Sequence, residues 1–511
     1  MKKIILSLLG PFLFSQQNVV ISTSSSPNEP SITINENNTN QIAAGANLNN
    51  YYYSTDAGLT WNTRKLTSSY GVWGDPSLLF DRLGNLFFAH LSNPSSGNWI
   101  DRIVVQKSTD NGVTYNNGSF TGLNGLKNQD KQWIGKDKNN NLYLTWTQFD
   151  EYGSSDPTKK SSILFSKSAN NGTSWSPPIK LNQIDGDCID ESNTVEGAVP
   201  ATGPNNEIYT SWASSQGIIF DKSTDGGTTW LPNDKIIATI PGGWSFNVPG
   251  LDRANGLPIT ACDISNSAYN GTIYVNWSDQ RNGTTDTDIW LVKSTDGGEN
   301  WSNPIRVNND TAGKQQFLTW MAIDQTNGNL YFVFYDRRNY TDNKTDVYMA
   351  KSSDGGQTFT NKKISQNAFT PNDQIFFGDY TNIAVHNGVI RPIWGDQVNG
   401  VSRVLTALVK DSDFLAVDEI SDNKNEVNME LYPNPVQDEA YLSYKLHENS
   451  KVKIEIFDAS GKLLKTVLDK NQAYGKYVEK IDIAKLSLTK GNYILQLKIN
   501  NTIKKSVKFI K

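Results

Sequence analysis

Ser223-Thr224-Asp225-Gly226-Gly227-Thr228-Thr229-Trp230 is an eight-residue block that occurs in six related copies along the chain. All copies begin with serine, carry Asp or Asn two positions later, have glycine at the fifth position and end in an aromatic residue. They begin at Ser54, Ser108, Ser168, Ser223, Ser294 and Ser352. Self-similarity of this kind is typical of repeat architectures.

The chemistry of the block is that of a tight turn between two strands. An Asp or Asn side chain accepts hydrogen bonds from turn N–H groups, glycine tolerates a positive φ, and the aromatic residue covers the sheet. Strand-like runs precede and follow each block, and four strands per repeat predict a propeller blade. The side chains at the third position are Asp56, Asp110, Asn170, Asp225, Asp296 and Asp354.

The block resembles the Asp box, or BNR repeat, of sialidase-like β-propellers, although Asn170 replaces the aspartate in the third copy. We therefore expect an all-β chain with a propeller over residues 18–415. Innermost strands are expected to begin near residues 29, 74, 130, 194, 257, 316 and 375, which favours seven blades, with six as the alternative. The last unit has no box, so we expect Asn18 to Ser22 to supply its fourth strand and remove an exposed edge.

Residues 1–17 have the pattern of a secretory signal peptide, because Met1-Lys2-Lys3 precedes an apolar run from Ile4 to Phe14. No later window approaches the roughly 18 apolar residues of a spanning helix, so we expect a soluble, exported protein without a transmembrane span. With 47 basic and 52 acidic residues, the net charge of −5 disfavours nucleic-acid binding. In an oxidising compartment Cys188 and Cys262 are expected to form a disulfide, with free buried thiols as the alternative.

A polar linker is expected at residues 416–428, followed by a small β-sandwich at 429–511. This tail resembles the type A sorting domain of the type IX secretion system of Bacteroidetes-type bacteria. The resemblance implies that an outer-membrane translocon and its shuttle barrel recognise the tail, which is then usually removed while the protein is attached to surface lipopolysaccharide. A domain that only packs against the propeller is the alternative. The motif residues are Tyr432, Pro433, Asn434, Pro435, Gly461, Gly491, Lys508 and Lys511.

Ligands of propellers usually lie on the face opposite the boxes, over the central channel. Two adjacent blades carry a charged motif there, with Asp279 before Arg281 and Asp336 before Arg338. Planar guanidinium groups suit a carboxylate or sugar-hydroxyl clamp. The alternative is a set of Arg–Asp bridges that hold long loops.

Acidic residues recur at the heads of the innermost strands and are expected to ring the channel mouth, where they could act as acid and base or accept hydrogen bonds from loops. They are Asp75, Asp130, Glu196 and Asp379, the last followed by Tyr380. Aromatic residues lie at the same level, and their flat faces suit sugar rings. The candidates for ligand binding are Trp133, Trp244 and Trp320, with Trp73, Phe317 and Phe377 nearby.

The sialidase resemblance implies hydrolysis of terminal sialic acid by three arginines, a Tyr/Glu pair and an Asp acid/base. This chain has no Phe/Tyr-Arg-Ile-Pro motif, and Arg391 lies inside a strand. The candidates for catalysis are Asp379, Tyr380 and Glu196. No spacing indicates a metal site, and we expect no cofactor. We expect recognition of an extracellular glycan or surface partner, with a sialidase-like hydrolase and a non-catalytic envelope scaffold as alternatives.

Overall fold

The computed structural model describes residues 17–414, 429–446, 448–458, 462–486, 488–500 and 502–511. The chain divides into two compact units, Met1–Lys410 and Asp411–Lys511. The expected signal peptide, except for its last residue, the expected linker 416–428 and Gly461 lie outside the described residues. Within the described residues, no helix has the length and apolar character needed to cross a membrane.

The N-terminal unit is built from antiparallel sheets, which confirms the all-β prediction. Within residues 17–414 there are seven successive sheets with four strands in line. The first three are β2 (Ser31–Ile34), β3 (Ile42–Ala46), β4 (Asn50–Ser54) and β5 (Asn62–Lys65); β6 (Gly74–Phe80), β7 (Leu86–Leu91), β8 (Ile103–Ser108) and β9 (Ser119–Thr121); and β10 (Asn128–Lys136), β11 (Leu142–Phe149), β12 (Ser161–Ser168) and β13 (Ile179–Lys180).

The next three sheets follow in chain order. They are β14 (Glu196–Thr202), β15 (Ile208–Ser214), β16 (Gly217–Ser223) and β17 (Lys235–Ala238); β20 (Ile259–Cys262), β21 (Ile273–Asp279), β22 (Asp288–Ser294) and β23 (Ile305–Arg306); and β24 (Gln316–Asp324), β25 (Asn329–Asp336), β26 (Asp346–Ser352) and β27 (Thr360–Lys363). A short hairpin, β18 (Ser245–Phe246) with β19 (Ala254–Asn255), is inserted between the fourth and fifth sheets.

The last sheet combines both ends of the unit. It contains β28 (Asn382–His386), β29 (Val389–Val398), β30 (Val401–Ala407) and β1 (Asn18–Ser22), while β31 (Val409–Lys410) also pairs with β29. Asn18 is the Cα partner of Ala407. The prediction that Asn18–Ser22 supplies the outermost strand of the last sheet is therefore confirmed.

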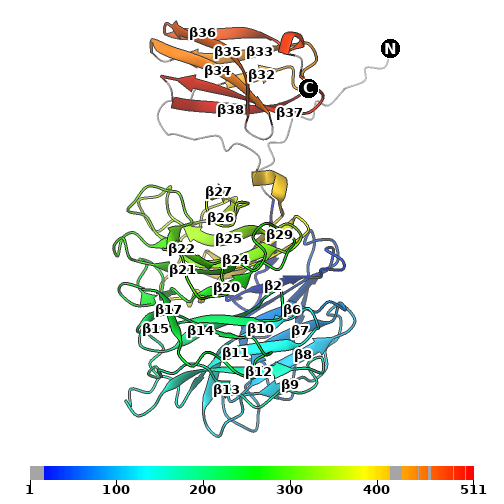
Figure 1. Ribbon diagram of the computed structural model, residues 1–511, viewed down its shortest axis with the longest axis vertical. Helices are drawn as coiled ribbons and strands as arrows, with labels where there is room; N and C mark the ends of the chain where they lie inside the picture. Colours follow the sequence, from blue (N-terminus) through cyan, green and yellow to red (C-terminus); the bar gives the residue numbers. More distant parts are fainter. Residues whose placement is uncertain (1–16, 415–428, 447, 459–461, 487, 501) are drawn as a thin grey trace. The chain divides into compact units, whose positions relative to one another are not determined.

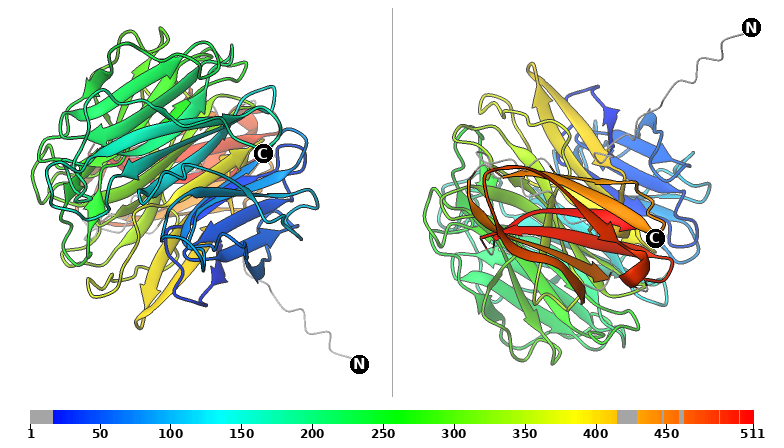
Figure 2. Two further views of the ribbon diagram at one scale, coloured as in Figure 1. Left: turned by 90° about the horizontal axis from the view of Figure 1, so that it is seen from below. Right: turned by 90° about the horizontal axis from the view of Figure 1, so that it is seen from above.

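The innermost strands form a closed ring, which makes the unit a β-propeller. In order, β2, β6, β10, β14, β20, β24 and β28 each contact the next, and β28 contacts β2. Both views of Figure 2 show the blue strands of the first sheet beside the yellow strands of the last. Second strands such as β7, β11, β21 and β25 are almost wholly buried, whereas the outermost β5 is exposed throughout.

The Asp boxes connect the third and fourth strands and join neighbouring sheets. In the fourth box, Ser223 Oγ donates to Asp225 Oδ1 at 2.8 Å, and Thr229 N donates to the same oxygen at 2.8 Å. Trp230 packs edge-on against Phe165 of the preceding sheet, with ring centroids 4.9 Å apart. An aspartate is not essential, because Asn170 Oδ1 accepts the corresponding bond from Ser174 N at 3.0 Å.

The predicted disulfide is wrong, because Cys188 and Cys262 are both free and buried. Cys188 lies in the loop between β13 and β14, on the face opposite the boxes. Cys262 ends β20 at the box end of its sheet, where it pairs with Ile273. Two thiols at opposite ends of the strands cannot reach the short Cα–Cα separation of a disulfide. Burial raises the pKa of both thiols, to about 12 for Cys262.

The C-terminal unit is a small two-sheet domain with its own apolar core. One sheet has the order β32 (Met429–Tyr432), β33 (Glu439–Leu446), β36 (Gly475–Asp482). The other has the order β35 (Leu463–Gln472), β34 (Ser450–Asp458), β37 (Asn492–Ile499), β38 (Thr502–Ile510). Two short 3-10 turns, η1 (Asp411–Phe414) and η2 (Ala484–Leu486), complete the described elements of this unit, which is drawn in orange and red in Figure 1.

The closing strand should contribute measurably to stability. Ile21 is buried in a core cluster with residues of the first and last sheets, whereas its neighbour Val20 is 47% exposed. We expect Ile21→Ala to lower the free energy of unfolding by about 2–4 kcal/mol in denaturant titrations. Val20→Ala is the matched control and should change it by less than about 0.5 kcal/mol. Equal effects of the two substitutions would contradict the assigned register of β1.

Candidate functional site

A cleft of about 410 Å³ opens over the mouth of the central channel of the propeller. It is lined by the loops before the innermost strands and between the second and third strands, on the face opposite the boxes. Its floor is charged and its walls carry apolar and aromatic side chains. The floor is formed by Glu29, Asp75, Asp130, Lys131 and Arg253, and the walls include Leu48, Trp73, Trp99, Tyr152 and Phe376.

Lys131 is the centre of the floor. Its Nζ lies 2.7 Å from Asp379 Oδ2, 3.5 Å from Asp75 Oδ2 and 3.9 Å from Glu29 Oε1. These four side chains come from the first, second, third and seventh sheets or from the segment leading into them, and all are buried. The floor therefore links sheets that are remote in sequence and meet only because the ring is closed.

Arg253 extends the floor towards the fourth sheet. This residue sits in the inserted hairpin, where it forms an ion pair with Asp379 and a second with Asp190 at 2.9 Å. Tyr152 Oη also donates to Asp190 Oδ2, at 2.7 Å. Asn255 Nδ2 donates to the carbonyl of Asp379 at 2.9 Å. The hairpin thus holds Asp379 from one side while Lys131 holds it from the other.

The backbone at the heads of the innermost strands repeats a left-handed conformation. Glu29, Asp75 and Lys131 have φ of 49°, 48° and 51°, and each precedes the first channel-lining residue of its strand by two positions. The same place is taken by Gly197, Leu318 and Gly378 in the fourth, sixth and seventh sheets. A non-glycine residue in this region costs on the order of 1–2 kcal/mol, and such residues cluster at functional sites.

Burial and neighbouring charges set the protonation of the floor. Burial raises the pKa of Glu29 well above its usual value, with Asp75 adding to the effect. Burial also raises the pKa of Asp130, to about 8. Burial works against ionisation of Asp379, yet Lys131 and Arg253 outweigh it and hold the pKa of that carboxyl low. At neutral pH the uncharged Asp130 therefore lies in the same cluster as the ionised Asp379 and the cations Lys131 and Arg253.

The walls of the cleft carry accessible aromatic rings. Trp73 and Trp99 are 36% and 40% exposed and meet edge to face at 6.4 Å. Trp99 also meets Tyr152 edge to face at 5.6 Å. Across the cleft, Phe376 lies beneath the guanidinium of Arg253 at 5.2 Å. Such rings offer flat apolar faces directly above hydrogen-bonding groups.

The aromatic candidates Trp133 and Trp320 lie below the floor, inside the channel. Their ring centroids are 4.2 Å apart, and Tyr380 packs against Trp133 at 5.3 Å. The space that these rings line has a volume of about 20 Å³, enough for roughly one water molecule. In this structure the three rings close the channel, so a sugar ring has no room beside them.

Two further candidates are buried away from the cleft. Trp244 is 4% exposed in an apolar cluster, and its Nε1 donates to Thr194 O at 3.0 Å. Glu196 is fully buried, and no donor lies within hydrogen-bonding distance of either carboxyl oxygen. Burial, together with the neighbouring Asp190, raises the pKa of Glu196 well above its usual value. Their assignment to ligand binding and catalysis stays a prediction, and it would require these side chains to become exposed.

The two arginine motifs form local ion pairs. Arg281 Nη2 lies 2.6 Å from Asp279, and Arg338 Nη2 lies 2.7 Å from Asp336. Both guanidinium groups also stack on aromatic rings of their own sheets. None of these four residues lines the cleft. This arrangement agrees with the alternative of bridges that hold loops.

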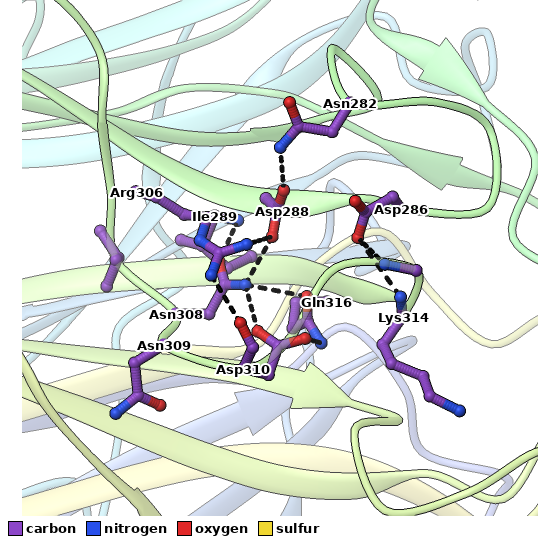
Figure 3. Close-up of polar contacts among 12 residues, drawn as sticks. Asn282, Asp286, Asp288, Ile289, Arg306, Asn308, Asn309, Asp310, Lys314 and Gln316 are labelled. Carbon is purple, nitrogen blue, oxygen red and sulfur yellow. Dashed lines mark hydrogen bonds and ion pairs between the residues drawn. The ribbon is translucent and has the colours of Figure 1, made fainter.

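Asp286 and Asp288, which follow Arg281 in the chain, are also held by local hydrogen bonds. Asn282 Nδ2 and Asn308 Nδ2 each donate to one oxygen of Asp288, at 2.7 and 2.6 Å. Lys314 N donates to Asp286 Oδ1 at 3.3 Å. Figure 3 shows how these polar side chains converge between the fifth and sixth sheets. Their oxygens are used to fix long loops to one another.

Sequence reasoning found part of the floor. The sequence predicts Asp75, Asp130 and Asp379 at the channel mouth because they stand at the heads of innermost strands, and all three lie there. Glu29 was missed although Glu29-Pro30-Ser31 and Asp75-Pro76-Ser77 are similar and occupy equivalent places. Lys131 follows Asp130 directly. Arg253 lies in a hairpin without a counterpart in the other repeats, so no periodic signal pointed to it.

Comparison with known families identifies the tail and one box. Residues 430–511 match the family described as a secretion system C-terminal sorting domain, and residues 52–63 match the BNR/Asp-box repeat. The C-terminal unit is a type IX secretion sorting domain. The protein is therefore secreted to the cell surface or beyond it, and its tail interacts with the secretion machinery. No curated protein matches the chain.

Four motif residues of the sorting domain lie close together, namely Asn434, Gly491, Lys508 and Lys511. Asn434 Nδ2 donates to Lys508 O at 2.8 Å, and Ile510 N donates back to Asn434 Oδ1 at 3.1 Å. Gly491 and Lys511 exchange backbone hydrogen bonds of 3.1 and 3.0 Å. The ends of the domain, which are about eighty residues apart in sequence, are thus tied together at one place.

Several solved structures resemble the chain. A polysaccharide lyase of family PL25, an ulvan lyase, is 12% identical, with a TM-score of 0.45, covering 77% of this chain and 96% of its own. The NanB sialidase from Streptococcus pneumoniae is 10% identical, with a TM-score of 0.44, covering 73% and 84%. A protein of unknown function from Dyadobacter fermentans is 11% identical, with a TM-score of 0.44, covering 77% and 97%. The strand order and the closed ring of sheets establish the propeller fold, and these likenesses assign no activity to the chain.

The raised pKa of Asp130 predicts a specific pH dependence of stability. The native state keeps this proton up to about pH 8, whereas the unfolded chain releases it near pH 4. Stability should therefore fall as pH rises between these values, by up to about 1.4 kcal/mol per pH unit from this group. We expect the free energy of unfolding of Asp130→Asn, relative to that of the parent, to be higher at pH 8 than at pH 5, as measured by denaturant titration.

The control for this measurement is Asp342→Asn, at an aspartate whose side chain is 60% exposed. It should shift stability equally at the two pH values. An Asp130→Asn effect that is the same at pH 5 and pH 8 would show that the carboxyl is already ionised in the native protein.

Proposed function

We propose that this secreted propeller recognises an extracellular glycan in the cleft over its channel mouth. The observation that carries the proposal is the combination of exposed rings on the walls, chiefly Trp73, Trp99 and Phe376, with buried donors and acceptors on the floor. Sugars present apolar faces that stack on aromatic rings and hydroxyl groups that need hydrogen bonds.

The size and preorganisation of the cleft support this proposal. A volume of about 410 Å³ falls within the range of roughly 300–1,000 Å³ that is typical of small-ligand sites. The floor is held in place by ion pairs from several sheets, so little ordering is needed on binding. Secretion to the cell surface or beyond brings the cleft into contact with extracellular polysaccharides.

Trp99→Ala should weaken glycan binding without unfolding the protein. The ring is 40% exposed on the cleft wall, so its removal takes away stacking surface but little core packing. We expect roughly tenfold or greater loss of affinity for glycans found by array screening and measured by calorimetry. The matched control is Phe120→Ala, since Phe120 is 37% exposed on the outermost strand β9.

The control should bind with unchanged affinity. If Trp99→Ala also binds as well as the parent, the ligand lies elsewhere on the propeller. If no glycan binds to the parent protein, the envelope-scaffold alternative gains support instead.

A second candidate function, glycoside hydrolysis, is favoured by the buried acids of the floor. A general acid must hold a proton at working pH, and Asp130, with its pKa raised by burial to about 8, satisfies this requirement. Asp379 is a weaker candidate, because its oxygens are occupied by Lys131, Arg253 and Asn255. Tyr380 lines the closed channel below the floor.

If the cleft hydrolyses glycosides through Asp130, turnover should fall as pH rises through about 8, because the proton donor is lost. Asp130→Asn should reduce turnover of fluorogenic glycosides by about 100-fold or more, while glycan binding remains within a few fold. Parent protein that binds a glycan and releases no product over long incubation would favour the binding function.

A further inference from the structure

The charges on the floor of the cleft are balanced within the protein. Lys131 Nζ has three carboxylates within 4 Å, those of Asp379, Asp75 and Glu29. Arg253 is paired with Asp379 and with Asp190. Each cation of the cleft therefore already has at least two carboxylate partners. An anionic ligand would have to compete with these carboxyl groups for Lys131 and Arg253. A cationic ligand would be repelled by the same two side chains.

The floor nonetheless offers both hydrogen-bond donors and acceptors to a ligand. Lys131 and Arg253 carry N–H groups, Asp75 carries carboxyl oxygens, and all three residues line the same cleft. Burial raises the pKa of both Glu29 and Asp130, to about 8 for Asp130, so at neutral pH the Asp130 carboxyl group carries an O–H group. A mixture of donors and acceptors whose cations are already paired within the protein is complementary to a set of hydroxyl groups.

The backbone indicates which of these residues matter most. Glu29, Asp75 and Lys131 occupy left-handed positions that glycine fills at Gly197 and Gly378. Glycine would adopt the same conformation without strain. Three adjacent sheets therefore keep charged side chains where the fourth, sixth and seventh sheets have Gly197, Leu318 and Gly378, and all three charged residues line the cleft.

We propose that the cleft binds an uncharged sugar ring, and that Glu29, Asp75 and Lys131 recognise its hydroxyl groups. This inference rests on the proposed glycan recognition and narrows it to one class of saccharide. The aromatic walls, including Trp99, cover one face of the ring, and the three floor residues form hydrogen bonds with its edge.

The class of ligand is tested with three series of oligosaccharides of matched length: neutral hexose and pentose oligomers, uronic-acid or sulfated oligomers, and glucosamine oligomers. Binding to the full-length protein is measured by calorimetry at low and high salt. We expect binding to the neutral series, with an affinity that is nearly independent of salt, because no net charge is exchanged.

Binding confined to the acidic or the basic series would overturn this inference and leave the proposed glycan recognition intact. Absence of binding in all three series would instead contradict the proposed function. The two failures are therefore distinguishable in one experiment.

The role of the floor residues is tested with Asp75→Asn. Asparagine keeps the shape of the side chain and tolerates the left-handed backbone, while Lys131 retains its 2.7 Å contact with Asp379. One of the two acceptor oxygens of the Asp75 side chain becomes an NH2 donor. We therefore expect roughly tenfold or greater loss of affinity for neutral oligosaccharides. Asp342→Asn, on a loop outside the cleft, should leave affinity unchanged.

Thermal unfolding is recorded for each variant to show that it is folded. A folded Asp75→Asn variant with the affinity of the parent would overturn the assignment. If that variant does not fold, Glu29→Gln is measured in its place, and the same loss is expected because one acceptor oxygen of the Glu29 carboxyl group becomes a donor.

Discussion

Closure of the ring is the constraint on which the rest of this structure depends. The strand β1 joins β30, so that Asn18 and Ala407 become neighbours and the first and last sheets cannot separate. One consequence is visible at the channel mouth, where Asp379 N donates to Glu29 Oε1 at 3.1 Å across 350 residues of sequence. The floor of the cleft can form only when these two segments adjoin. The most local feature of the fold, a repeated turn, therefore leads to its least local feature, a charged cluster shared between sheets.

The energetics of that cluster favour a rigid floor. Each buried ion costs several kcal/mol of lost hydration, and an attraction in the interior offsets this cost only when the geometry is good. Lys131 meets this condition through three carboxylates, and Asp379 through two cations and an amide. Removal of one partner would weaken the compensation of a buried charge, so the members of the cluster hold one another in place. Such mutual restraint is what a binding site needs if its groups are to be ordered before the ligand arrives.

The parts of this structure that repeat were predictable from sequence, and the parts that arise from closure were only partly so. The spacing of boxes such as Ser223 to Trp230 indicated the propeller, and the missing fourth strand of the last unit pointed correctly to Asn18–Ser22. Counting along each repeat placed Asp75 and Asp379 at the mouth. Their cationic partners were not predicted, because the choice of Lys131 and Arg253 depends on which sheets face one another across the channel. The disulfide was predicted wrongly for a related reason, since cysteine composition carries no information about the face on which each thiol lies.

Residues of the same type have different roles here according to where their counter-charge comes from. Arg281 and Arg338 are each compensated by an aspartate two positions earlier in the chain, so each pair can form within its own sheet. Lys131 is compensated by carboxylates from three other parts of the ring. A pair of the first kind stabilises a loop and would be little affected by events at the mouth. A cluster of the second kind connects the first, second, third and seventh sheets at the floor of one cleft. The symmetry of the propeller supplies the backbone positions, and the side chains on the floor of the cleft depart from that symmetry.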